Sequence, residues 1–371
     1  MKKGLWACLY PLASLYGLGV LARNWMFDKG ILKSKSYQIP VLSVGNLTVG
    51  GTGKTPHIEY LIRLLGEQFR VATLSRGYRR KSRGFVLADS ETEMWKIGDE
   101  PMQMHCKYPE VQVAVDENRC EGIEQLIALK SENGRPSVDV VLLDDAYQHR
   151  YVKPGLQILL TDYHRPIYED ALLPVGRLRE PLRGMERADI IIVTKCPWEQ
   201  FKESDALRIR SRLKPAAHQE LYFTAMRYGL MKSFIGDGQC DYSAMSEVDN
   251  VLLVTGIANP QPLIEHLKKY TGALHTLIFA DHHNFSHKDI SRINEQFSSL
   301  GQNGRKVMLV TTEKDAVRLR EQGKSLSDDL KKNSYVCPIE ISFLHGGGEV
   351  FNQKIISYVR KNSGNGLLVE P

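Results

Sequence analysis

The residues with the clearest chemical meaning in this chain are a lysine and a threonine that follow a run of glycines. The stretch GGTGKT ends in Gly53, Lys54 and Thr55. In such a loop the backbone N–H groups point toward phosphate oxygens, the lysine reaches the β- and γ-phosphates, and the threonine hydroxyl ligates Mg²⁺. We therefore predict a nucleotide-phosphate site made of Gly50, Gly51, Thr52, Gly53, Lys54 and Thr55.

The loop departs from the usual phosphate-binding pattern at one position. The pattern G-x-x-x-x-G-K-[ST] has glycine where this chain has Thr48. The glycines nearest the phosphates are kept, and Pro56 falls in the first turn of the next helix, where its missing donor costs little. A tight turn with an incidental Gly-Lys-Thr is the alternative, but strand, loop and helix occur in the expected order.

Two adjacent aspartates could supply the metal chemistry that such a loop needs. Asp144 and Asp145 end the apolar run VDVVLLDD, which has the composition of a buried strand. One carboxylate can hold Mg²⁺ while the other positions a ligand or nucleophile. A helix cap or turn is the alternative for two aspartates at a strand end. Next to a phosphate loop, the pair favours a catalytic metal site.

Three further polar groups lie in predicted loops and are ambiguous one by one. IGDEP offers Asp99, PVGRLREPLRG offers Arg179 and Glu180, and FADHHNFSHKD offers His282. Loop hydrogen bonding or capping explains each equally well. A metal site at the Asp-His-His cluster lacks a second cluster with ligand spacing. A catalytic role for these groups is predicted only if they lie together around a transferred phosphate.

The elements that must position these residues are strands alternating with helices. Apolar runs predict strands at 41–44, 71–74, 111–115, 138–143, 156–160 and 190–193, and then again at 251–257, 273–279 and 306–312. This alternation predicts an α/β fold: a parallel-sheet domain of the P-loop NTPase type and a second, smaller α/β domain. The predicted domains are an N-terminal helix at 1–36, the P-loop domain at 37–219, the smaller domain with an extended linker at 220–350, and a C-terminal helix and tail at 351–371.

Composition restricts the class of protein. The chain has 371 residues, a net charge of +6, and six cysteines without a C-x-x-C pair, which favours a reducing compartment. The segment 70–83 carries six basic residues and no acid. Such a run suits a solvated face, an anionic membrane or a phosphorylated substrate. Nucleic acid is not predicted as a partner, because Tyr78 is the only aromatic residue interleaved with these charges.

The N-terminus contains a charge-free stretch of 19 residues, Gly4 to Ala22, between lysines and an arginine. A cleaved signal peptide would send a nucleotide site to a compartment without ATP. A membrane span is just long enough, though Pro11 and two glycines weaken it. We favour a helix in the membrane interface with aromatic residues at headgroup depth. An apolar helix packed on the protein core remains the alternative.

Together these motifs resemble a known family. SVGNLTVGGTGKTP, SRGYRR, GDEP, LLDDAYQHR, LPVGRLREP and DHHNFS occur in this order between about residues 41 and 286. This order is similar to that of the tetraacyldisaccharide 4′-kinases of lipid A biosynthesis, which share the departure at the position of Thr48. The resemblance implies transfer of the ATP γ-phosphoryl group to the 4′-hydroxyl of a tetraacylated glucosamine disaccharide 1-phosphate, with Mg²⁺. It also implies action at the cytoplasmic face of the bacterial inner membrane, without an obligate protein partner.

The resemblance also implies roles for individual residues. Lys54 is expected to serve the phosphates, Asp99 to take the proton of the sugar hydroxyl, and His282 to orient Asp99. The expected metal residues are Thr55, Asp144, Asp145 and Glu180. The expected acceptor-side residues are Asn46, Arg76, Tyr78, Gln148 and His149.

A P-loop NTPase switch that couples nucleotide hydrolysis to partner assembly at the membrane is the rival hypothesis. A guanine-specific switch would have the base-reading motif N-K-x-D. The nearest segments, VTKCP at 193–197 and TTEKD at 311–315, do not fit that spacing. The sequence therefore favours the kinase.

Overall fold

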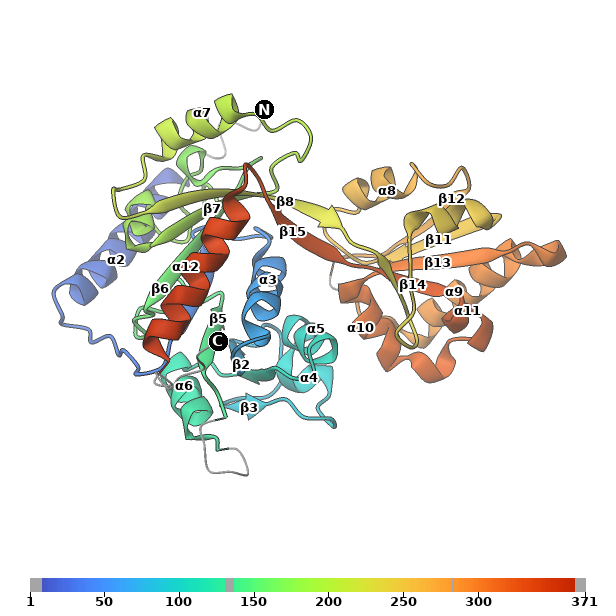
Figure 1. The fold of residues 1–371 in the computed structure, drawn as a ribbon, viewed down its shortest axis with the longest axis horizontal. Coiled ribbons are helices and arrows are strands. Elements are labelled where there is room, and N and C mark those ends of the chain that lie inside the picture. Colours follow the sequence, from blue (N-terminus) through green and yellow to red (C-terminus); the bar gives the residue numbers. More distant parts are fainter. Residues whose placement is uncertain (1–8, 131–136, 282, 364–371) are drawn as a thin grey trace, which may run out of the picture. The chain divides into compact units, whose positions relative to one another are not determined.

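The computed structural model describes residues 9–130, 137–281 and 283–363. The described residues form two compact units. The first unit lies within the ranges Met1–Met226 and Ile341–Pro371, and the second lies within Arg227–Glu340. Each unit contains a β-sheet with helices beside it (Figure 1). The boundaries that the sequence suggested at residues 36, 219 and 350 stay predictions.

The first unit is built on a large sheet. Its strands in the described residues are β1 (Val41–Asn46), β2 (Val71–Ser75), β3 (Val86–Leu87), β4 (Gln112–Val115), β5 (Val140–Asp144), β6 (Leu156–Asp162), β7 (Ile190–Thr194), β8 (Glu220–Tyr228) and β15 (Ile339–Phe343). They lie in the order β15-β8-β7-β6-β1-β5-β2-β4-β3. The pairs from β8 through β4 are parallel, and β3 is antiparallel to β4. Parallel strands bring their carboxyl ends to one edge, where ligands bind in such sheets.

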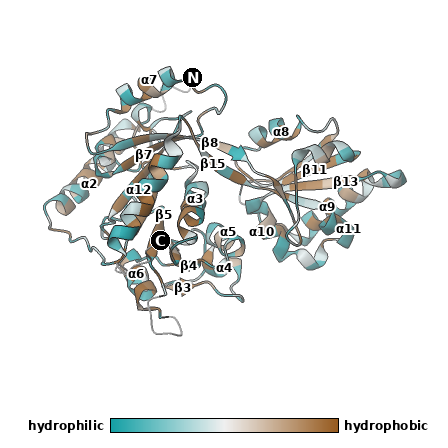
Figure 2. Cartoon of the chain, in the orientation of Figure 1, coloured by the Kyte–Doolittle hydropathy of each residue, from teal (hydrophilic) through white to brown (hydrophobic). Residues whose placement is uncertain are grey.

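Helices cover both faces of this sheet because alternate strand residues point to opposite faces. Leu42 and Val44 belong to a core cluster with residues of α3 (Lys54–Gly66), α5 (Asp99–Lys107) and α12 (Gly347–Asn362). Val41 belongs to a cluster on the other face with α6 (Arg119–Ala128), and Ile191 to one with α7 (Glu203–Leu213). A short helix, α4 (Met94–Ile97), precedes α5. Hydrophobic colour gathers in the strands in Figure 2, whereas α7 is mostly hydrophilic.

The second unit repeats this layout on a smaller scale. Its strands are β9 (Met231–Ser233), β10 (Gln239–Cys240), β11 (Asn250–Thr255), β12 (Leu274–Ile278), β13 (Val307–Thr312) and β14 (Ser334–Cys337), in the order β10-β9-β14-β13-β11-β12. Strands β11 to β14 pair in parallel, and β9 is antiparallel to β14 and β10. Its helices are α8 (Gln261–Leu267), α9 (His287–Leu300), α10 (Glu313–Glu321) and α11 (Asp328–Lys332).

Each strand predicted from an apolar run is present, with ends shifted by one or two residues. Helix α8 lies between β11 and β12, and helix α9 lies between β12 and β13. The predicted alternation of strands and helices is therefore confirmed.

The N-terminal helix α2 (Tyr10–Asp28) presents two kinds of surface. Ala13, Gly17 and Phe27 are buried, and a side chain at Gly17 would lie 2.7 Å from Leu172 Cδ1. A stripe of large apolar side chains with helical spacing is exposed, namely Leu12, Leu15, Leu18, Leu21 and Trp25. Leu15 and Leu18 are 68% and 64% exposed. None of the helices in the described part of the chain has both the length and the hydropathy to cross a bilayer.

Candidate active site

The glycine-rich loop connects the carboxyl end of β1 to the first turn of α3. Gly50 and Gly53 have φ values of 108° and 88°, in the region that favours glycine. A side chain at Gly53 would also lie 2.3 Å from Met226 Cε. Lys54 begins the helix, and its Nζ lies 3.5 Å from Asn46 Oδ1. The loop therefore has the conformation and the helix N-terminus that a phosphate group needs.

The structure explains why Thr48 replaces the usual first glycine. Thr48 forms an antiparallel bridge with Leu178 and is buried. The neighbouring N–H of Val49 donates to Arg177 O at 2.8 Å, and the N–H of Arg179 donates to Leu47 O at 2.7 Å. An extended residue held by a β-bridge does not need the conformational freedom of glycine. The segment 177–179 thus fixes the first half of the loop.

Residues at the carboxyl end of β7 hold the second half of the loop in place. The Thr194 hydroxyl donates to Thr52 O at 2.9 Å. Lys195 Nζ donates to Gly51 O at 2.5 Å and to Asp162 Oδ2 at 2.7 Å. The backbone carbonyls at the tip of the loop are therefore held from the neighbouring strand end, which leaves its N–H groups to face a ligand.

The two aspartates at the end of β5 lie beside this loop and have different environments. Asp144 is 3% exposed, and its Oδ1 has no hydrogen-bond partner among the described residues. Burial first, and then the nearby Glu100 carboxylate, raise the pKa of Asp144 to about 7. Asp145 Oδ1 lies 3.6 Å from Lys54 Nζ and 3.1 Å from Arg179 NH1. Asp144 thus offers an unused buried oxygen, whereas Asp145 already joins two cations.

Asp99 and Glu100 form the first turn of α5, where a helix N-terminus favours carboxylates. The loop that carries Arg76 and Tyr78 packs directly against this turn. A side chain at Gly98 would lie 2.7 Å from Tyr78 O, and one at Gly77 would lie 2.8 Å from Ile97 O. Because Glu100 also acts on the pKa of Asp144, the GDEP and SRGYRR motifs lie beside the aspartate pair.

A group of cations surrounds His149. Burial first, and then the charges of Arg119, Arg23 and Arg76, lower the pKa of His149 to about 4. Its Nε2 is buried without a partner in the described structure. Arg119 is 4% exposed, and Asp145 and Asp144 both act on its pKa, which burial lowers. A neutral histidine among arginines suits an anionic ligand better than a proton transfer step.

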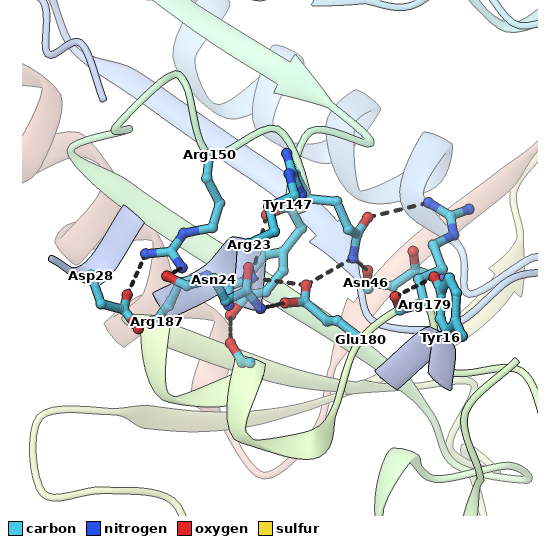
Figure 3. Close-up of polar contacts among 12 residues, drawn as sticks. Tyr16, Arg23, Asn24, Asp28, Asn46, Tyr147, Arg150, Arg179, Glu180 and Arg187 are labelled. Atoms are coloured by element: carbon cyan, nitrogen blue, oxygen red, sulfur yellow. Dashed lines mark hydrogen bonds and ion pairs between the residues drawn. The ribbon is translucent and has the colours of Figure 1, made fainter. Parts of the chain in front are cut away.

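Glu180 lies in a polar cluster that Figure 3 shows together with residues of α2. Gln148 Nε2 donates to Asn46 O at 2.8 Å and to Glu180 Oε1 at 3.1 Å. Glu180 is 2% exposed, and its Oε1 also accepts from Arg187 at 2.8 Å. Its Oε2 accepts from Asn24 Nδ2 at 3.2 Å. The carboxylate of Glu180 is therefore occupied by protein donors.

Most of the predicted site residues come together at this edge of the first sheet. The predicted catalytic residue His282 lies outside the described residues, so its pairing with Asp99 stays a prediction. Sequence reasoning missed Arg119, Arg187 and Lys195. Arg119 and Lys195 follow the predicted strands at 111–115 and 190–193, so the rule that strand ends meet at one edge could have indicated them. Arg187 had no comparable signal.

The donors available here fit a magnesium ion bound together with phosphates. Within the three described ranges, no three histidine, cysteine, aspartate or glutamate side chains gather in a way that could hold a metal. Mg²⁺ usually takes one or two protein carboxylates and completes its shell with waters and substrate phosphates. The unpartnered oxygen of Asp144 is a hard ligand of that kind.

Comparisons with known proteins agree with this geometry. A family model described as tetraacyldisaccharide-1-P 4′-kinase matches residues 5–359. A relative from Bacteroides thetaiotaomicron named tetraacyldisaccharide 4′-kinase is 52% identical, over 98% of this chain and 95% of its own. A relative of the same name from Flavobacterium johnsoniae is 47% identical over 95% of this chain and 97% of its own. A crystal structure of LpxK from Aquifex aeolicus in complex with ATP has a TM-score of 0.73 and 27% identity, and the match covers 96% of this chain and 99% of that one.

Proposed function

Since this chain belongs to the tetraacyldisaccharide 4′-kinase family, it is a kinase that phosphorylates a lipid A precursor with ATP, and we propose that the residues at the carboxyl edge of its first sheet carry out the transfer. The observation that supports this assignment is the position of Lys54. Its Nζ lies 3.6 Å from Asp145 Oδ1, so the phosphate loop and the aspartate pair share one site. Membership of the family favours the kinase over the switch that hydrolyses nucleotide to drive partner assembly.

In this proposal the backbone of residues 50–53 and the amino group of Lys54 bind the β- and γ-phosphates of ATP. Arg179, 3.1 Å from Asp145, adds a second cation near the transferred group. Thr55, Asp144 and Asp145 would hold Mg²⁺, which supplies positive charge to the phosphate oxygens. Phosphoryl transfer depends mainly on such positioning and charge.

Asp99 accepts the proton of the acceptor hydroxyl. The bond from the 4′-oxygen to the γ-phosphorus forms while the bond from that phosphorus to the bridging oxygen breaks, and ADP leaves. His282 orients Asp99 in this proposal. Asn46, Arg76, Tyr78, Gln148 and His149 lie on the acceptor side, and the cations around His149 suit a phosphorylated glycolipid.

The direct test of this function measures phosphate transfer. Purified protein, labelled ATP and an extracted tetraacylated disaccharide 1-phosphate should give a labelled lipid, and omission of the acceptor should give none. Asp99→Ala and His282→Ala should each lower kcat while nearly preserving ATP binding, and the double variant should be hardly worse than Asp99→Ala. Independent effects of the two substitutions on kcat would remove the pair from the mechanism.

We also propose that the exposed stripe of α2 lies on the cytoplasmic face of the inner membrane, where the glycolipid resides. A contiguous exposed apolar stripe is typical of a lipid contact. Leu15→Ser with Leu18→Ser should weaken sedimentation with vesicles and raise KM for a lipid acceptor, but not for a short-chain soluble one. Leu207→Ser, an equally exposed leucine on α7, is the matched control. Unchanged sedimentation of the double variant would contradict the membrane contact.

A further inference from the structure

The inner face of α2 is hydrogen-bonded to the segments that carry the active site (Figure 3). The hydroxyl of Tyr16 donates to Arg179 O at 2.6 Å, and Arg23 NH2 donates to Gln148 O at 3.2 Å. Asn24 Nδ2 donates to Glu180 Oε2 at 3.2 Å. Over about two and a half turns, the helix thus contacts three residues whose side chains act at or beside the site.

Glu180 is the point where these contacts meet. Its Oε2 accepts from Asn24, and its Oε1 accepts from Gln148 at 3.1 Å and from Arg187 at 2.8 Å. Gln148 then donates to Asn46 O, at the end of the strand that begins the phosphate loop. Gln148 Oε1 also accepts from Arg179 NH1 at 3.3 Å, the nitrogen that contacts Asp145. A displacement of Glu180 would therefore change the position of both Gln148 and Arg179.

We propose that α2 is a positioning element for phosphoryl transfer, and that Asn24 is a positioning residue that acts on the site through Glu180. This inference rests on the proposed assignment of Arg179, Gln148 and Asp145 to the active site. It adds a second role to the helix: its outer face contacts lipid, and its inner face sets the geometry of the chemical step. A lipid surface that stabilises the seated helix then raises kcat as well as the local concentration of acceptor.

The physical reason is the precision that phosphoryl transfer needs. A shift of about 1 Å in a positioning group can cost about 100-fold in rate. Glu180 is buried, so it cannot exchange a lost protein donor for bulk water without moving. Asn24→Asp keeps the shape of the side chain but places a carboxylate against that of Glu180. This substitution should push Glu180 out of place, whereas Asn24→Ala only removes one donor.

The first experiment compares Asn24→Asp and Asn24→Ala with wild type on a soluble short-chain acceptor at saturating concentration. Asn24→Asp should lower kcat about tenfold or more, the scale of a hydrogen bond to a charged group, and Asn24→Ala less. Vesicle binding should stay close to wild type, and circular dichroism should show that both variants remain folded at the assay temperature. Ser14→Ala, an exposed polar residue of the same helix that bonds to Tyr10 O, is the matched control and should keep full kcat. Equal kcat for Asn24→Asp and Ser14→Ala would overturn the proposal.

The second experiment asks whether Asn24 acts through Glu180. In a Glu180→Gln background, Asn24→Asp should lower kcat by less than about twofold, because two residues that act as a unit are not additive. A full additional loss would overturn the proposal. Asn24→Asp should also leave the Mg²⁺ concentration for half-maximal rate unchanged. A shift in that concentration would overturn positioning and support the predicted metal contact of Glu180. Lys54→Ala, which should be inactive in any background, reports separately on the proposed active site.

Discussion

Each unit places a buried carboxylate at or just beyond the carboxyl end of a parallel strand, and the two carboxylates differ in how many protein groups they contact. Asp315, in the first turn of α10 after β13, accepts hydrogen bonds at its Oδ2 from the hydroxyls of Thr255 and Thr312 and from the N–H of Gly256, at 2.8, 2.7 and 3.0 Å. Arg318 NH1 lies 3.5 Å from its Oδ1. The Oδ1 atoms of Asp315 and Asp144 are both buried without a hydrogen bond, but Oδ1 of Asp315 faces Arg318, whereas no ion pair among the described residues reaches Asp144 at the end of β5.

This difference separates a structural carboxylate from one that serves a ligand. A buried carboxylate that accepts several hydrogen bonds and faces a buried guanidinium holds its surroundings together, and removing one partner is costly. A buried carboxylate with an unused oxygen and a raised pKa destabilises the empty protein and gains its partner when a ligand binds. By this criterion Asp144 serves a ligand in the first unit, whereas Asp315 is a structural carboxylate of the second.

The largest effect should come from the cation that faces Asp144 and Asp145. Lys54→Ala removes the positive charge nearest the transferred group, and we expect kcat to fall about 10³-fold, the scale of a lost transition-state contact. Tm should change little, because Lys54 lies in the first turn of α3 and is not part of the core. Rates of labelled phosphate transfer check this prediction. More than about a tenth of wild-type kcat would show that the loop is not the catalytic phosphate site.

The next effect should fall on stability. Asp315→Asn leaves the buried Arg318 without its carboxylate, so the free energy of unfolding should fall by about 3 kcal/mol or more. Urea denaturation measures the loss. Asp328→Asn is the matched control, since Asp328 pairs with Lys331 at the same spacing but on the surface. It should cost less than about 0.5 kcal/mol. Equal losses for the two variants would show that Asp315 is not a structural carboxylate, and its distinction from Asp144 would then fail.

A pH profile of stability should separate Asp144 from its neighbour. The pKa of Asp144 is raised to about 7, so the folded protein holds a proton there that the unfolded chain releases near pH 4. This contribution to stability is complete at low pH and is lost as the pH rises toward and through 7. Nucleotide-free Asp144→Asn should lack this loss.

Thermal unfolding at pH 5 and pH 8 measures the difference. At pH 8, Asp144→Asn should exceed wild type by about 2–4 °C in Tm, the shift that about 1 kcal/mol gives in a domain of this size. At pH 5 the advantage should shrink. Asp145→Asn is the control, because Asp145 is paired with Arg179 and Lys54 and gains nothing from losing its charge. A gain in Asp145→Asn would show that burial of Asp144 is not the cause.

The smallest effect concerns a paired carboxylate within the first unit. Asp162 binds Lys195, which also holds Gly51 O of the phosphate loop. Lys195→Met should raise KM for ATP about fivefold, the equivalent of about 1 kcal/mol, and change kcat by less than about twofold. Lys214→Met is a control with the same positive φ but no such bond, and should behave as wild type. If the main effect were a loss of kcat, Lys195 would contribute to the chemical step rather than to the binding of ATP.

The sequence predicted β1, β2, β4 to β7 and β11 to β13, because their apolar runs are long and bounded by turns. It did not predict β3, β10 and β15, which lie at sheet edges. It also predicted the phosphate loop, the aspartate pair and the motif that carries Asp99, since each has a chemical signature within a few residues. The sequence did not predict the polar cluster around Glu180. Glu180 was expected to hold metal, and its contacts with Asn24 and Arg187 join segments far apart in the chain that no local pattern links. Arg119 was missed although it follows the predicted strand at 111–115, because a single arginine at a helix start has no motif of its own.

The return of the chain to its first unit has a consequence for how the protein is made. The core of that unit contains Phe351, Ile355 and Val359 of α12, and the Tyr60 hydroxyl of α3 donates to Asn352 Oδ1 at 2.8 Å. During synthesis, α3 therefore has no α12 to pack against until almost 300 further residues have been added. The second unit is continuous in sequence, and we expect it to fold once residue 340 has emerged from the ribosome. Such long-range closure is slow and leaves apolar surface exposed in the nascent chain. A truncation that removes α12 should thus yield a polypeptide that chaperones retain, even though every motif of the active site is present.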